Sequence, residues 1–87
     1  MNIMARVKLQ HRSEQLQALL MKGNSVQIIA ARELLRLSLV EMHELGYWRE
    51  HPDQFQNEMR LYRASAKIMF NPPASMSEPD KRAQYSP

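Results

Sequence analysis

The sequence predicts an all-α fold, a small helical bundle of two long antiparallel helices with a further helix at the N-terminus. Two observations predict it. Apolar residues recur at the three- and four-residue spacing of an amphipathic helix across residues 25–45 and 52–70. Glycine, proline and helix-capping residues fall between these stretches rather than inside them.

The composition fits a single small globular domain. The 87 residues are 44% hydrophobic and 24% charged, with a formal net charge of +3, which is ordinary for a folded chain. The chain contains no cysteine, which excludes disulfides and thiolate zinc sites. Residues 1–12 carry charges where a secretory signal peptide has its apolar segment, so we expect a cytoplasmic protein without membrane contact.

Residues 1–22 permit two conformations. No glycine or proline interrupts them, so one long helix can form, and residues 13–22 are expected to be helical with Ser13 as the N-cap. Residues 2–10 also alternate polar and apolar side chains, which is the pattern of a β-strand. A strand here could pair only with its copy in another subunit, because nothing else in the sequence resembles one. The sequence leaves the choice between helix and strand open.

Residues 25–45 form the most apolar of the expected helices. Gly23 suits a left-handed position after the preceding helix, and Asn24 or Ser25 can cap the new one. One stripe faces the core, formed by Ile28, Ala31, Leu35, Leu39 and Met42. Other faces are also apolar, through Ile29, Leu37 and Val40. A helix that is apolar on several sides, in so short a chain, predicts a homodimer formed through this helix.

Residues 52–70 form the last expected helix. Gly46 ends the helix before it, and Pro52 and Asp53 are favourable in a first helical turn. Its apolar stripe comprises Phe55, Met59, Tyr62, Ala66 and Met69. Asn71-Pro72-Pro73 stops the helix, because proline cannot continue it. We therefore expect one domain over residues 1–70 and a flexible tail over residues 71–87.

Basic residues gather on the opposite face of residues 52–70. Arg60, Arg63 and Lys67, which we call the basic strip, share one side of the helix. Such a strip is either a solvated surface or a contact for phosphates or an acidic partner. Tyr47 and Trp48 follow Gly46 at a helix junction, where aromatic rings either cap a core or anchor an interface. We expect these five residues to form the partner-binding surface.

The N-terminal segment suggests a second class of function. Arg6, Lys8 and Gln10 are polar side chains able to read base edges, and a helix, a Gly23–Ser25 turn and a second helix over 26–35 follow them. This order resembles the ribbon-helix-helix family of dimeric DNA-binding proteins. The resemblance implies a transcriptional regulator with a strand over residues 1–12. The chain departs from the family because no turn residue separates ribbon from helix and the first helix is short.

A shorter motif gives a remote alternative. His51-Pro52-Asp53 lies between two helices, and residues 77–85 follow in the tail. Both stretches resemble the J-domain co-chaperones, which would imply binding to a chaperone partner. However, residues 25–45 mix arginine with glutamate, whereas the corresponding helix of that family is strongly basic.

No arrangement of residues points to catalysis. The three histidines are not at metal-ligand spacing, and neither a phosphate-binding glycine loop nor a nucleophile elbow is present. We therefore expect a non-enzymatic protein without cofactor, metal or small-molecule substrate. A short, basic, methionine-rich helical chain resembles the accessory regulators of bacteriophages and bacterial mobile elements, which act by binding one host or viral protein. The sequence thus predicts a small regulator that occupies a partner protein.

Overall fold

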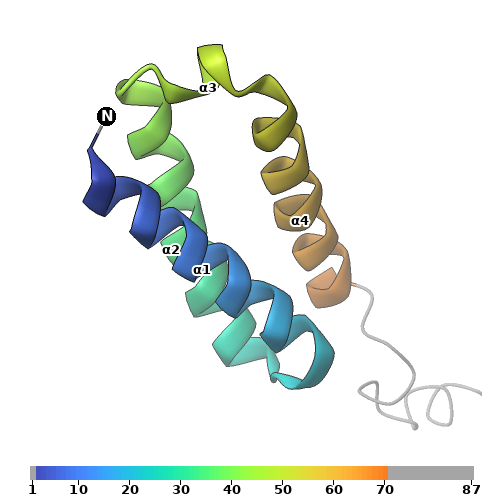
Figure 1. The fold of residues 1–87 in the computed structure, drawn as a ribbon. Helices are drawn as coiled ribbons and strands as arrows, with labels where there is room; N and C mark the ends of the chain where they lie inside the picture. The colour runs from blue at the N-terminus through green and yellow to red at the C-terminus, as the bar shows by residue number, and fades with distance from the viewer. Residues whose placement is uncertain (1, 71–87) are drawn as a thin grey trace, which may run out of the picture.

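The computed structural model describes residues 2–70, with the side chains of residues 2–68; the expected tail lies outside the described residues. Three long helices, α1 (Ile3–Lys22), α2 (Ser25–Glu44) and α4 (Pro52–Phe70), are joined by two short connections and a four-residue helix, α3 (Tyr47–Glu50). The predicted all-α fold is confirmed. The chain runs down α1, back along α2, turns at α3 and returns along α4 (Figure 1).

The N-terminal segment is a helix, and the strand of the alternative prediction is wrong for the described residues. The Asn2 side-chain oxygen accepts hydrogen bonds from the backbone N–H groups of Met4 (2.9 Å) and Ala5 (3.3 Å), which caps α1. Ser13 is therefore not an N-cap but a buried residue in the middle of α1. Without a turn residue before Gly23, the helical hydrogen bonds continue unbroken from this cap.

The pairing of the long helices differs from the prediction. Residues 25–45 and 52–70 were expected to form the main hairpin, yet α2 packs most extensively against α1. On α1, a row of fully or almost fully buried side chains contributes to this contact, namely Ala5, Leu9 and Leu16. An ion pair between Lys8 Nζ and Glu41 Oε1 (3.3 Å) also joins α1 to α2.

The predicted core stripe of α2 is confirmed. Ile28, Ala31, Leu35, Leu39 and Met42 are all buried. The predicted stripe of α4 packs half-buried against the same core at Phe55, Met59 and Tyr62. Ala66 is also half-buried, whereas Met69 lies beyond the described side chains. The hairpin of α1 and α2 thus supplies most of the core, and α4 covers one side of it.

The turns follow the predicted residues, with one difference in mechanism. Asn24 and Gln27 form a reciprocal capping box at the start of α2. Gly46 has φ of 76°, the left-handed conformation that ends α2. Gly23 was expected to be left-handed as well, but its φ is −87°. Glycine is needed there for space, since a Cβ atom would lie 2.8 Å from the Leu19 carbonyl oxygen.

Two hydrogen bonds between arginine and serine side chains join neighbouring helices. Arg12 of α1 donates from Nη1 to Ser38 Oγ of α2 (2.9 Å), and Arg32 of α2 donates from Nε to Ser65 Oγ of α4 (2.7 Å). Ser38 and Ser65 are fully buried. A buried hydroxyl needs a hydrogen-bond partner, and each arginine provides one while its charge stays near the surface. The second contact joins α4 to α2.

Candidate functional site

The basic strip is exposed on α4, as its helical spacing predicts. Arg60, Arg63 and Lys67 all lie on the outer face of the helix. Arg60 donates from Nη1 to Asn57 Oδ1 of the same helix (3.0 Å). Within the described residues, none of the three forms an ion pair. The strip therefore presents three neighbouring positive charges to whatever approaches this side of α4.

Tyr47 and Trp48 lie in the core at the corner between α2 and α4. Their exposed fractions are only 7% and 8%. The Trp48 indole N–H donates to the Leu39 carbonyl oxygen (3.1 Å), and its ring packs against Phe55 with centroids 5.1 Å apart. The two aromatic residues thus cap the core at the end of the bundle, which is the first of the two roles predicted for them. Little of either ring is left for a partner to contact.

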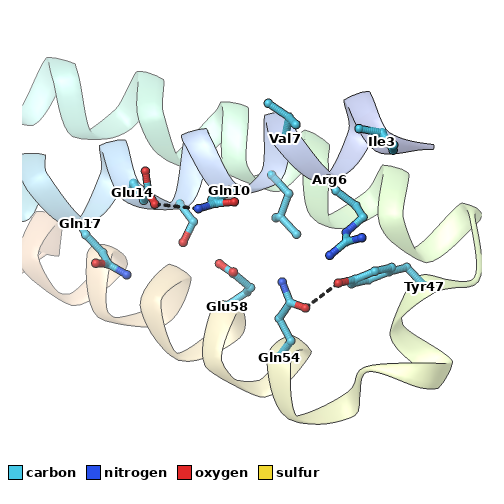
Figure 2. Close-up of a pocket in the computed structure, with 11 residues that line it drawn as sticks. Ile3, Arg6, Val7, Gln10, Glu14, Gln17, Tyr47, Gln54 and Glu58 are labelled. Carbon is cyan, nitrogen blue, oxygen red and sulfur yellow. Dashed lines mark hydrogen bonds between the residues drawn. The ribbon is translucent and has the colours of Figure 1, made fainter. Parts of the chain in front are cut away.

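A polar groove runs between α1 and α4 beside this corner. Figure 2 shows Gln54 and Glu58 reaching from α4 toward α1, with Arg6 directed toward Tyr47. The groove has a volume of about 570 Å³. The Tyr47 hydroxyl donates to Gln54 Oε1 (2.7 Å), which joins α3 to the first turns of α4. The groove can offer a visiting side chain both hydrogen-bonding and charged groups.

Glu58 is the most perturbed group of this groove. Burial raises the pKa of its carboxyl above the ordinary 4.5, and the hydroxyl of Ser13 beside it offsets only part of that shift. Its Oε1 atom is buried without a hydrogen-bond partner among the described residues. A half-buried carboxylate with a free oxygen attracts a hydrogen-bond donor or a cation. Glu58 thus leaves one unsatisfied oxygen in the contact between α1 and α4.

The residues expected to read DNA do not form one surface. On a strand, Arg6, Lys8 and Gln10 would point the same way, but on α1 the middle residue faces α2. Lys8 is paired with Glu41, Gln10 donates to Glu14 Oε2 (3.1 Å), and Arg6 lies over the Tyr47 ring, 5.9 Å from its centre. The geometry that the ribbon-helix-helix resemblance requires is absent from the described residues.

His51-Pro52-Asp53 begins α4. The Phe55 N–H donates to the His51 carbonyl oxygen (3.1 Å), and the exposed His51 ring stacks on Tyr47 with centroids 4.0 Å apart. A proline at the first helical position accounts for the start of the helix. The co-chaperone alternative thus stays a prediction that this geometry does not test.

Sequence reasoning missed the interhelical contacts of Arg12, Arg32 and Glu58. A signal was present, since Ser38 and Ser65 fall at the spacing of the apolar stripes around them. A small polar residue in a buried stripe indicates a close helix contact that needs a donor. Which donor reaches it depends on the crossing of two helices, and spacing within one helix does not give that crossing.

Comparisons with protein-family models, with curated proteins and with solved structures found no match to this chain. None of the described helices is both long and apolar enough to cross a membrane. Within the described residues, no cluster of three or more acidic or histidine side chains could hold a metal ion.

Proposed function

We propose that this chain is a small, non-enzymatic binding protein that regulates an acidic partner protein by occupying it. The observation that supports the proposal is the basic strip of Arg60, Arg63 and Lys67, which is exposed and has no ion-pair partner among the described residues. Aligned cations on a rigid helix are complementary to a surface of carboxylates. The size and charge of the chain further suit a cytoplasmic regulator of a phage or a bacterial mobile element.

A protein partner fits the strip better than a nucleic acid does. Three cations on one helix neutralise few phosphates, and duplex DNA binding at physiological salt depends on many such contacts. The side chains expected to read bases are engaged within the chain, at Lys8 by Glu41 and at Gln10 by Glu14. The basic strip has no such acidic partner among the described residues.

The proposal is tested by reversing the charge of the strip. The variant Arg60→Glu, Arg63→Glu and Lys67→Glu should keep the helical circular dichroism signal, because all three side chains are exposed. Partners are captured from lysate with the parent chain and identified by mass spectrometry, and the affinity of each purified candidate is then measured. We expect the variant to bind the true partner about 100-fold more weakly, since facing like charges cost about 3 kcal/mol.

A matched control reverses exposed charges elsewhere. Lys22→Glu and Arg49→Glu change exposed residues outside α4 and should leave the affinity unchanged. A triple variant that is folded and binds as tightly as the parent would contradict the proposal. So would tight binding of duplex DNA by the parent chain at physiological salt, with an affinity that falls steeply as salt is added.

A further inference from the structure

The outer face of α2 exposes a row of apolar side chains. Val26, Ile29, Leu37 and Val40 are 75%, 52%, 45% and 43% exposed, and we call them the outer stripe. They lie on the side of α2 opposite the buried residues Ile28, Ala31, Leu35 and Met42. Single exposed apolar residues are common, whereas four on one face of a helix, here on either side of Glu33, mark a contact surface.

A groove lined mostly by apolar groups borders the outer stripe. It lies between α2 and α4, has a volume of about 330 Å³ and opens beside Val40 and His43. Phe55, Met59 and Tyr62 of α4 form its far wall. Stripe and groove together form a ridge next to a depression, and a surface of that shape can receive a copy of itself.

We propose that the outer stripe joins two copies of this chain into a symmetric dimer, with the two α2 helices packed antiparallel. The charges of α2 select this occupant and this direction. Along the helix, the midpoint between Ile29 and Val40 is also the midpoint between Glu33 and Arg36. It falls between Leu34 and Leu35. An antiparallel register that sets Ile29 opposite Val40 of the second copy therefore sets Glu33 opposite Arg36 in both directions.

The charge pairing disfavours the parallel arrangement. Glu33 and Arg36 already bond within one chain, at 2.6 Å between Arg36 Nη2 and Glu33 Oε2. In the antiparallel dimer each arginine also faces a carboxylate of the other copy. In a parallel dimer each glutamate would meet its own copy, and like charges facing each other are destabilising.

Two further features fit the same register. It sets Val26 of one copy opposite His43 of the other, so Val26 and Ile29 both face residues that line the groove beside α4. It also brings Glu44 to the start of the other α2, at Ser25. The first turn of α2 contains no acidic residue, and a helix N-terminus favours a negative charge. Each copy thus supplies the acidic group that the other lacks.

Sedimentation of the full chain tests the assembly. The parent chain is expected to sediment at twice its monomer mass of 10.2 kDa at micromolar concentration. Ile29→Glu and Glu33→Arg should each give monomers that remain helical, and the double variant Glu33→Arg, Arg36→Glu should restore the dimer because the charges again alternate. Met21→Glu, at an apolar residue 84% exposed on α1, is the matched control and should remain dimeric.

Cross-linking tests the direction. Because the chain has no cysteine, copies carrying Ile29→Cys can be mixed with copies carrying Val40→Cys and oxidised. We expect the 29–40 disulfide to form in the mixture, and neither variant alone to cross-link efficiently. A parent chain that stays monomeric, or a dimer cross-linked through position 29 to itself, would overturn the proposal. The dimer uses a different face from the basic strip, so failure of one proposal leaves the other intact.

Discussion

At the scale of single residues, the polar side chains in the interior explain how the helices meet. Ser38 and Ser65 are fully buried and each receives an arginine hydrogen bond from a neighbouring helix. Glu58 lies at the remaining contact, between α1 and α4, where the Ser13 hydroxyl lies beside its carboxyl but the Oε1 atom has no hydrogen-bond partner among the described residues. A buried acceptor without a partner costs stability, so this oxygen weakens the contact between α1 and α4.

Glu58→Gln should stabilise the folded chain at neutral pH. The pKa of Glu58 is raised on folding, so the parent has its full stability below pH 4.5 and loses part of it as pH rises through the higher folded-state value. Glutamine has no charge to bury. We expect the denaturation midpoint of the variant to be higher than that of the parent at about pH 7. At about pH 4 the difference between the two midpoints should be smaller.

Glu14→Gln provides the comparison for that experiment. Glu14 also lines the groove but is exposed, so its substitution should change stability similarly little at both pH values. Equal midpoints for Glu58→Gln and the parent at both pH values would show that the carboxylate of Glu58 is fully solvated in the folded chain.

At the scale of elements, α4 owes its place to few contacts. Arg32 donates from Nε to Ser65 Oγ, while its guanidinium group lies over the Tyr62 ring, 4.1 Å from the ring centre. The Ser65 hydroxyl in turn donates to the Tyr62 carbonyl oxygen (2.6 Å). Arginine is suited to this position because its planar group can stack on a ring and donate sideways at once.

Arg32→Lys should therefore destabilise the protein by about 1 to 2 kcal/mol, through loss of the charged hydrogen bond and the stacking. In a double-mutant cycle with Ser65→Ala, we expect a coupling energy of about 1 kcal/mol from chemical denaturation. Arg49→Lys, at an exposed residue of α3, is the matched control and should change stability by less than about 0.5 kcal/mol. Additive effects of Arg32→Lys and Ser65→Ala would mean that α4 is held by apolar packing alone.

The same scale shows what sequence patterns predict well. The bounds of α4 and the core stripe of α2 match the expectation because both depend on spacing within one helix. The sequence alone does not distinguish helix from strand over residues 3–9, because helical and alternating patterns coincide there, and the Asn2 cap decides between them. The role of Tyr47 and Trp48 also depends on the corner made by α3, which no local pattern marks.

At the scale of the whole molecule, residues 2–70 contain a continuous core. Side chains of all four helices meet in it, with Leu16 from α1, Leu35 from α2, Trp48 from α3 and Phe55 from α4. Residues 71–87 lie outside the described residues and have few apolar side chains. The prediction of a single domain over residues 1–70 is therefore tested by removing the segment that follows it.

Truncation after Pro73 should leave the domain folded. Pro72 and Pro73 cannot continue α4, and the segment beyond them offers little apolar surface to bury. The thermal midpoint of the shortened chain should lie within a few degrees of that of the full chain. A larger drop would show that the segment packs on the bundle, and Tyr85→Ala in the full chain would then test whether its ring is responsible.

The corner at α3 gives the molecule a built-in optical probe. Trp48 is the chain's single tryptophan, and its indole is bonded to α2 and packed against α4. Indole emission shifts to longer wavelength when the ring becomes hydrated. If α4 swings away from α2 while the hairpin stays helical, fluorescence would change at constant circular dichroism, and opening of the corner could be timed separately from unfolding.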